Sequence, residues 1–340
     1  MESQSKAYII AEVAQAHDGS VGNAHAFIDL AKEVGADAVK FQMHIADIES
    51  GPEETWRVNF SFQDATRFDY WRRMEFNFDQ WRELKSHCER EGLDFLCSPF
   101  SQRAVRDLLE LGCSVFKVAS GELSNLLLLD ELNEKAEYII LSTGLASDNE
   151  IDIALSRFDY SESRVAVLQC TSEYPAPLES LNLAKISSWS KTLAAHRVGL
   201  SDHSGKITPA LMAYTKGARV FENHICFHKK QFGPDTPASL DPQEFKTMVT
   251  LLRQFEVMNQ TESNSASPEL KLENKIRFGK TLTYARDLQT GDIIARSDLE
   301  TKKPANLGVL PLNYITVVGR RLKKSVQMGE YIQEDDLDIR

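Results

Sequence analysis

The chain has 340 residues, 42% of them hydrophobic, which suffices for a sizeable core in one large domain or two. A net charge of −11 argues against non-specific nucleic-acid binding, and no apolar run approaches the roughly 20 residues of a membrane span. The N-terminal stretch lacks a signal-peptide pattern, and five irregularly spaced cysteines suggest no disulfide framework. We therefore expect a reduced, cytoplasmic location with no nucleic-acid or membrane partner.

Short apolar runs alternate with amphipathic stretches through the first three quarters of the chain. Nearly continuous apolar runs of this length are typical of parallel strands that are buried on both faces. Eight β-then-α units are what a (β/α)₈ barrel requires, so we predict a TIM barrel over residues 1–258. The runs cover residues 8–15, 37–42, 94–101, 115–122, 138–145, 165–175, 197–204 and 219–227.

Helical spacing of apolar residues predicts helices over 23–35, 101–112 and 208–217 between these runs. Residues 43–77 interrupt the alternation after the second run. Long structured connections are uncommon and often serve as lids or binding loops. This segment is rich in arginine and aromatic residues, so we interpret it either as a surface subdomain or as a cover over the substrate.

The last part of the chain changes character. Residues 259–274 are polar and rich in serine at their start, which predicts a linker. Residues 275–340 contain two related halves, "RDLQTGDIIARSDL" and "SVQMGEYIQEDDL", each with a glycine turn between short apolar pairs. We predict a small β-rich domain there.

Polar residues stand at the carboxyl end of nearly every predicted strand, which is where barrel active sites lie. One such residue alone is more often a hydrogen-bonded core group or a helix cap. Together at one barrel mouth they indicate a functional site. They are Glu12, Lys40, Gln42, Ser98, Lys117, Ser120, Glu122, Ser142, Thr143, Ser172, Tyr174, Ser201, His203, Glu222 and His224.

Two histidines and two lysines in this set suggest specific ligands. His203 and His224 follow adjacent strands, so their imidazoles are candidates for a mixed nitrogen and oxygen metal site that favours Mn²⁺. Lys40 and Lys117 end apolar strands, where a phosphate or carboxylate would offset the cost of a buried ammonium. Glu12 is the alternative partner for Lys40. Outside the set, His17 and His44 stay open, and we expect four histidines in helical or loop contexts to be structural: His25, His87, His196 and His228.

Several stretches resemble the sialic acid synthase family (N-acylneuraminate synthases). They include "GADAVKFQ", "FKVASGEL", "LQCTSEYP", "GLSDHS", "ENHICF" and "FGPDTPASLDP", and the tail resembles that family's antifreeze-like (SAF) domain. The resemblance implies a (β/α)₈ barrel followed by an SAF domain, in a domain-swapped homodimer. It also implies an N-acetylneuraminate synthase-like transferase, which joins phosphoenolpyruvate to an N-acylmannosamine-type sugar and releases phosphate.

The same resemblance implies roles for individual residues. His203 and His224 would hold a divalent metal, with Mn²⁺ expected and Mg²⁺ or Co²⁺ as alternatives. Glu12 matches a carboxylate that contacts the sugar. Active-site positions are also matched by Glu122, Tyr174 and Asp235, and phosphoenolpyruvate positions by Lys40, Lys117, Ser120, Ser172 and Ser201, with Ser98 a weaker candidate. We include Gln42 among the substrate-binding residues because it ends the second strand.

Three departures from the family's pattern bear on the acceptor sugar. "AHDG" replaces the usual N-H-N-G after the first strand, and Ser172 stands where an amide is common. Lys303, in "KKP", occupies the position of an arginine that reaches the sugar site of the partner subunit, and lysine lacks the planar fork of arginine.

Two other functions compete with this hypothesis. One is a different phosphoenolpyruvate aldol-type synthase that makes a ketodeoxy sugar acid, which the C-terminal domain disfavours. The other is a non-catalytic carbohydrate-binding protein on a decayed barrel, which the retained lysines and histidine pair disfavour.

Overall fold

The computed structural model describes residues 6–158, 164–193, 197–259 and 267–338. The chain divides into two compact units, Met1–Met258 and Asn259–Arg340. His196 and residues 260–266 of the expected linker lie outside the described residues.

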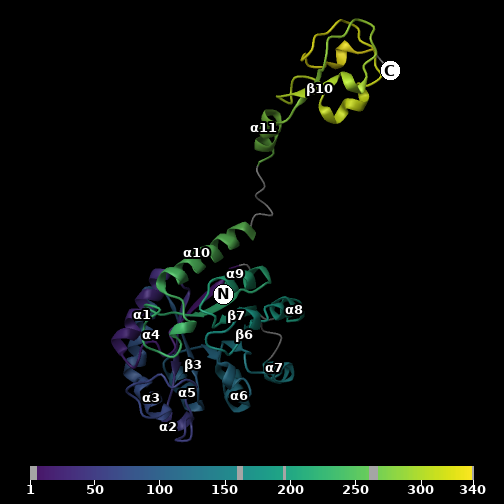
Figure 1. Cartoon of the computed structure of the whole chain (residues 1–340). Coiled ribbons are helices and arrows are strands. Elements are labelled where there is room, and N and C mark those ends of the chain that lie inside the picture. The colour runs from purple at the N-terminus through teal and green to yellow at the C-terminus, as the bar shows by residue number, and fades with distance from the viewer. Residues whose placement is uncertain (1–5, 159–163, 194–196, 260–266, 339–340) are drawn as a thin grey trace. The chain divides into compact units, whose positions relative to one another are not determined.

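The first unit is a closed parallel barrel of eight strands, which confirms the predicted fold (Figure 1). Each strand pairs with the next, and β8 closes the barrel against β1. The strands are β1 (Tyr8–Glu12), β2 (Ala38–Met43), β3 (Asp94–Pro99), β4 (Val115–Val118), β5 (Tyr138–Ser142), β6 (Val165–Cys170), β7 (Arg197–Asp202) and β8 (Val220–His224).

Helices surround the barrel, and their ends follow local sequence signals. α1 begins after Ser20, whose side chain accepts a hydrogen bond from the Asn23 amide, and ends at Gly35 in the left-handed conformation. α9 carries Pro209 in its first turn, where the missing N–H costs nothing. The surrounding helices are α1 (Val21–Val34), α4 (Phe78–Glu91), α5 (Gln102–Glu110), α6 (Leu126–Lys135), α7 (Asp148–Leu155), α8 (Ala184–Thr192), α9 (Thr208–Thr215) and α10 (Pro242–Asn259).

The barrel interior changes from apolar to polar along the strands. A separate apolar cluster fills the part of the barrel away from the carboxyl ends of the strands. It includes Ile10, Ala38, Leu96, Ile140 and Val220. Side chains two residues apart on a strand face the same side. The next inward positions toward the carboxyl ends are therefore Glu12, Lys40, Ser98, Ser142 and Glu222.

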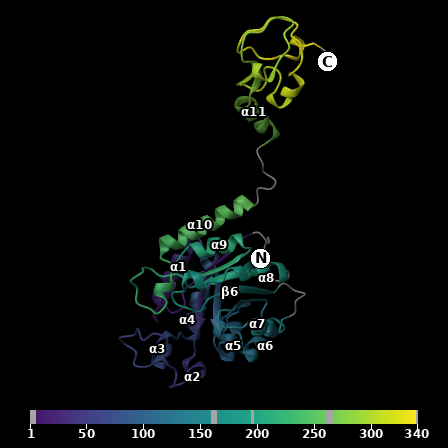
Figure 2. The same cartoon turned by 45° about the vertical axis from the view of Figure 1, so that its right-hand side comes forward.

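The segment after β2 folds into short helices, α2 (Ala46–Glu49) and α3 (Arg67–Met74). Figure 2 shows both at the end of the barrel away from the N-terminus. Arg73 fastens the segment, because its guanidinium donates to the carboxylates of Asp64 and Asp18 at 2.7 and 2.6 Å. Asp18 is one of the departures in "AHDG", and the structure gives it this anchoring partner. A side chain at the neighbouring Gly19, whose φ is +74°, would collide with the Arg73 carbonyl oxygen.

The second unit has its own small core. It contains α11 (Pro268–Phe278) and an antiparallel pair, β9 (Thr281–Tyr284) and β10 (Leu299–Lys302). Residues 268–274, which we expected in the linker, thus belong to a helix. The core is formed by Leu282, Tyr284, Leu288, Ile294, Val309, Val317, Leu322, Val326, Ile332 and Leu337.

Candidate active site

Strand register brings the predicted site residues together. Glu12 is level with Lys40 on β2 and with His224 on β8, and Ser201 is level with Glu222. These side chains border a cavity of about 630 Å³ at the carboxyl end of the barrel. The predicted residues that line it are Glu12, Lys40, Gln42, Lys117, Ser120, Glu122, Ser142, Ser172, Tyr174, Ser201, His203, Glu222, His224 and Asp235.

Three predicted residues do not line this cavity. The Thr143 hydroxyl donates to the backbone carbonyl of Leu168. Ser98 is buried beneath the cavity and accepts a hydrogen bond from the Lys40 ammonium at 3.1 Å. Lys303 belongs to the second unit, where its ammonium lies over the Phe278 ring. Ser98 therefore supports a lining residue rather than facing the cavity.

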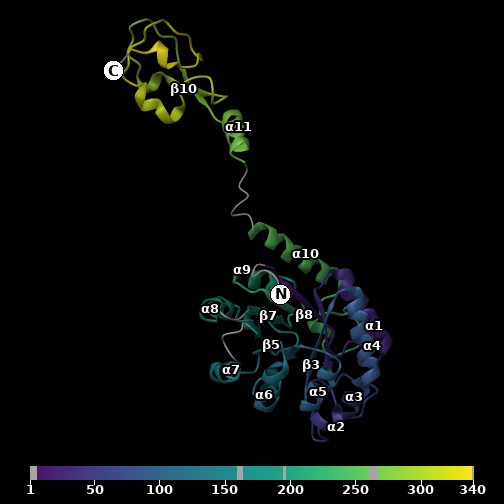
Figure 3. The same cartoon turned by 180° about the vertical axis from the view of Figure 1, so that it is seen from behind.

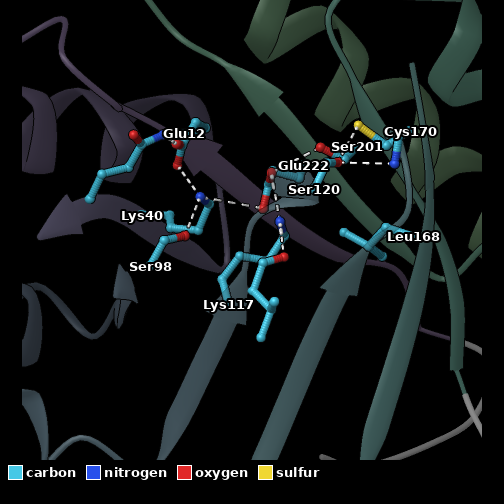
Figure 4. A network of polar contacts seen from close by, with 12 residues as sticks. Glu12, Lys40, Ser98, Lys117, Ser120, Leu168, Cys170, Ser201 and Glu222 are labelled. Atoms are coloured by element: carbon cyan, nitrogen blue, oxygen red, sulfur yellow. Dashed lines mark hydrogen bonds and ion pairs between the residues drawn. The ribbon is translucent and has the colours of Figure 1, made fainter. Parts of the chain in front are cut away.

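A buried ionic network forms the floor of the cavity (Figure 4). The Lys40 ammonium lies 2.8 Å from the Glu12 carboxylate and 3.7 Å from that of Glu222. The Lys117 ammonium also lies 3.7 Å from Glu222 and donates to the carbonyl of Val118. Ser201 donates to Glu222 Oε1, the oxygen that faces Lys117, at 2.9 Å. Glu222 is thus the carboxylate shared by both lysines.

The network fixes where charge resides. Burial alone would raise the pKa of Glu222, but the two lysines and Ser201 outweigh it and lower that pKa to about 2. Burial opposes the charge of Lys40 too, yet Glu12 and Glu222 outweigh burial and raise its pKa. Burial dominates at the other two groups, since it raises the pKa of Glu12 and lowers that of Lys117. Glu222 and Lys40 are therefore the most firmly charged pair.

Two polar side chains of the cavity floor can form further hydrogen bonds. Among the described residues, Ser142 Oγ and Glu222 Oε2 are buried and have no hydrogen-bond partner. Buried polar atoms are almost always paired in folded proteins. Because both residues line the cavity, a polar ligand there would complete their hydrogen bonding.

His203 and His224 lie side by side at the rim of the floor, with ring centroids 5.2 Å apart. Burial lowers the pKa of His224 to about 3, which keeps its nitrogens available as ligands. His203 Nδ1 lies 2.8 Å from the Thr171 carbonyl oxygen, so this nitrogen carries the proton and Nε2 faces the Tyr174 hydroxyl at 3.1 Å. Burial disfavours the charged form of His203, but Cys170 outweighs it and raises the pKa of His203 to about 9.

These two imidazoles fit a divalent metal as a two-nitrogen set. Among the described residues, His203 and His224 belong to no group of three His, Cys, Asp or Glu ligand atoms that all lie within 4.8 Å of one another. Water or substrate oxygens would have to complete the coordination, which is the arrangement of an open catalytic site. Because the raised pKa of His203 favours a second proton, on Nε2, metal binding at this nitrogen would also have to displace that proton.

The segment after β2 supplies one wall of the cavity through Trp56, Arg57, Val58, Phe60, Arg67, Tyr70 and Trp71. The Arg57 guanidinium lies 4.1 Å above the Tyr174 ring and donates to Asp235 at 2.7 Å. Tyr174 also stacks on His203, with ring centroids 4.1 Å apart, so it connects Arg57 to the histidine pair. Of the two interpretations of this segment, the contacts favour a cover over the cavity.

His44, which the sequence left open, is part of the site. Its ring stacks between Trp71 and Phe100, with centroid distances of 4.2 and 4.3 Å. Its nitrogens contact Gln42 at 3.0 Å and Glu49 at 2.5 Å. The available signal was its position two residues beyond Gln42, directly after the end of β2. His17, by contrast, is buried against Phe76 outside the cavity lining.

Comparison with known proteins identifies the family. The sequence pattern of the NeuB family matches residues 27–264, and that of the SAF domain matches residues 279–338. The chain belongs to the NeuB family. The suggested resemblance to sialic acid synthases is therefore confirmed, and the second unit corresponds to the SAF domain.

Relatives of this NeuB-family chain are named as synthases. It is 33% identical to the N,N'-diacetyllegionaminic acid synthase of Campylobacter jejuni, over 97% of this chain and 99% of that protein. It is 30% identical to the human N-acetylneuraminate-9-phosphate synthase, over 98% of this chain and 94% of that protein. The chain is an enzyme of this synthase family.

A solved structure supports the same relationship. The N-acetylneuraminic acid (sialic acid) synthetase of Leptospira borgpetersenii, in complex with citrate, aligns with a TM-score of 0.68 and 27% identity. The alignment covers 80% of this chain and 92% of that one. No helix among the described residues is long and apolar enough to cross a membrane.

Proposed function

We propose that this NeuB-family enzyme condenses phosphoenolpyruvate with an N-acylmannosamine-type or related amino-deoxy sugar, giving a nonulosonic acid and phosphate. The observation that carries the proposal is the pair of buried lysines on the cavity floor, beside polar atoms that lack partners. An anionic ligand would add charge-assisted hydrogen bonds there. The names of the relatives, legionaminic and neuraminate-9-phosphate synthases, supply the reaction type.

The floor would bind phosphoenolpyruvate. Lys40 and Lys117 share one carboxylate, Glu222. Burial raises the pKa of Glu12, the other carboxyl beside Lys40, so an arriving anion meets positive charge that is only partly compensated. Ser120 and Ser172 line the cavity beside them, and Ser201 and Ser98 fix Glu222 and Lys40. Binding the trianion would also favour the charged form of Lys117, whose pKa burial lowers.

The sugar would occupy the space between the floor and the wall, near Glu12, Glu122, Tyr174 and Asp235. C3 of phosphoenolpyruvate forms the new bond to the aldehyde carbon of the open-chain sugar, and the aldehyde oxygen takes up a proton. Water adds at C2, and the C2–O bond to phosphate breaks from the resulting tetrahedral intermediate. Glu12, whose pKa burial raises, is placed to hold a proton near the sugar.

A divalent metal, Mn²⁺ in our expectation with Mg²⁺ or Co²⁺ as alternatives, would be held by His203 and His224. When bound, it would polarise the sugar aldehyde as a Lewis acid. The Thr171 carbonyl, which accepts from Nδ1, would orient His203 for that role, and the metal would replace the contact of Nε2 with the Tyr174 hydroxyl.

Two further expectations stay predictions. A homodimer in which Lys303 of the SAF domain reaches the sugar of the partner subunit would complete the site, and we expect the enzyme to work in the cytoplasm.

The direct test is release of inorganic phosphate from phosphoenolpyruvate with Mn²⁺ and a panel of sugars, namely N-acetylmannosamine, its 6-phosphate and di-N-acetylated deoxy sugars. We expect release only when phosphoenolpyruvate and an N-acylated amino sugar are both present, together with a new nonulosonic acid by mass spectrometry. Phosphate release from phosphoenolpyruvate with a simple aldose phosphate, but with none of the N-acylated amino sugars, would favour the ketodeoxy sugar acid synthase. Absence of release from folded protein, with sugar binding retained, would favour the carbohydrate-binding protein.

A further inference from the structure

A second group of metal-ligating side chains lies on the outside of the barrel, where α1 packs against α4 (Figures 1 and 3). His25 and Asp29 are four residues apart on α1, and His87 and Glu91 are four residues apart on α4. Residues four apart share one face of a helix. Each helix thus presents one imidazole and one carboxylate to the seam between them.

The ligand atoms of Asp29, His87 and Glu91 all lie within 4.8 Å of one another. His87 Nε2 and Asp29 Oδ1 are already 3.1 Å apart, and the His87 side chain is only 14% exposed. A metal held at about 2.0–2.2 Å by nitrogen and carboxylate ligands separates those ligands by roughly 3–4 Å. Small side-chain rotations would therefore bring all three atoms to one ion.

His25 adds an independent observation. Its Nδ1 lies 2.9 Å from Nδ1 of His87, so one of these nitrogens must donate a proton to the other. The 3.1 Å contact of His87 Nε2 with Asp29 fits an N–H that donates to the carboxylate, with His87 Nδ1 accepting from His25. A metal ion at Nε2 would take the place of this proton, and His87 Nδ1 would then donate to His25.

Glu91 is suited to complete the set. The Lys32 ammonium donates to the backbone carbonyl of Glu91 and not to its carboxylate. In the described parts of the chain, the Glu91 carboxylate has no ion pair of its own. One imidazole and two carboxylates form a borderline ligand set that suits Zn²⁺ and similar ions.

We propose that Asp29, His87 and Glu91 bind a divalent transition ion such as Zn²⁺, with His25 orienting the His87 ring through its Nδ1. This site is separate from the His203 and His224 pair at the barrel mouth. Its ligands come from two helices, so the ion joins α1 to α4 and stabilises the outer layer of the barrel. It carries no step of the proposed reaction.

The test uses the full chain with His203→Ala and His224→Ala, which removes the pair at the barrel mouth. Zn²⁺ alone is the probe, in isothermal titration calorimetry and in thermal unfolding. We expect this double variant to keep one equivalent of Zn²⁺ and to unfold at a higher temperature when Zn²⁺ is bound, because an ion that binds only the folded state stabilises it.

Further substitutions, each added to the double variant, test which side chains bind Zn²⁺. His87→Ala should abolish the remaining equivalent, Glu91→Gln should weaken it about tenfold or more, and His25→Ala should weaken it about 10-fold as loss of an orienting partner does. Glu89→Gln is the matched control, since this exposed α4 carboxylate pairs with Lys85 and should leave Zn²⁺ binding unchanged. Circular dichroism verifies that each variant is folded, and Glu91→Gln retains a test if His87→Ala is not.

The proposal is overturned if the double variant binds no Zn²⁺ at 100 times the protein concentration, or if His87→Ala and Glu91→Gln both bind as the double variant does. Because the readouts are metal stoichiometry and unfolding temperature, neither outcome depends on whether the proposed reaction occurs.

Discussion

The floor and the wall of the cavity are built in different ways. The floor consists of inward side chains at the ends of neighbouring strands, and the register of the barrel alone sets Glu12 level with Lys40 and His224. The wall comes from one segment after β2, which side-chain contacts hold in place, such as Arg73 to Asp18 and Arg57 to Asp235. The floor is thus fixed by backbone pairing, whereas the wall depends on a few separable contacts. Substitutions in the floor should affect chemistry and anion binding, and those in the wall should affect the sugar.

The largest effect is expected at the histidine pair. We expect chelation of divalent metal, His203→Ala and His224→Ala each to lower kcat by about 100-fold or more, because a metal supplies several kcal/mol of charge stabilisation. Phosphate release with and without added Mn²⁺ measures this. Far-ultraviolet circular dichroism should stay unchanged, since both residues stand at strand ends. Full activity of either variant in chelator would rule out the pair as the metal site.

A smaller effect is expected for the lysines of the floor. Lys117→Met keeps the apolar stem and removes the charge, so it should raise KM for phosphoenolpyruvate about 10- to 100-fold, as the loss of a charge-assisted hydrogen bond worth about 1.5–3 kcal/mol would. KM for the sugar should change little. Lys185→Met is the control, since this lysine pairs with Asp148 on the surface. Equal KM values in both variants would place the anion elsewhere in the barrel.

The wall should show the opposite pattern. Arg57→Ala removes the cation above Tyr174 and the partner of Asp235, and we expect KM for the sugar to rise about 5-fold, in line with about 1 kcal/mol for a partly exposed cation–π contact. KM for phosphoenolpyruvate should stay near its original value. Arg72→Ala is the matched control, because this arginine of the same segment pairs with Asp47 and is 55% exposed. A similar sugar KM in the two variants would argue that Arg57 does not act on the sugar.

The same difference explains what the sequence could predict. The two-residue spacing of strands located Lys40, Lys117 and Glu222, because alternate side chains of a barrel strand point into the barrel. Whether Arg57 meets Asp235, 178 positions away, depends on how the segment after β2 folds back, and no periodicity encodes that. Ser98 shows a further limit of prediction from sequence. The spacing correctly placed its side chain inside the barrel, but only the packing shows that Lys40 covers it. The pairing of His25 with His87 likewise depends on how two helices meet.

At the anchor of the wall the expected effect is on stability and not on catalysis. The Asp64 side chain is 5% exposed and receives two hydrogen bonds from Arg73, which, with the bond from Ser61, lower its pKa. Asp64→Asn should therefore lower the free energy of unfolding by about 1.5 kcal/mol at neutral pH, near the lower limit for hydrogen bonds to charged groups. Asp79→Asn is the control, because its pair with Arg82 is exposed on α4 and such pairs contribute about 0–1 kcal/mol.

The pH dependence of this difference separates charge from packing. A carboxylate whose folded pKa lies below its unfolded value of about 3.9 stabilises the fold fully above that value, and the stabilisation is lost as pH falls through the folded pKa. The difference between wild type and Asp64→Asn, measured by urea unfolding, should stay constant from pH 8 to about pH 5 and shrink below about pH 4. A difference that persists undiminished into that acidic range would show that the asparagine disturbs packing, and that the ion pair with Arg73 does not hold the wall in place.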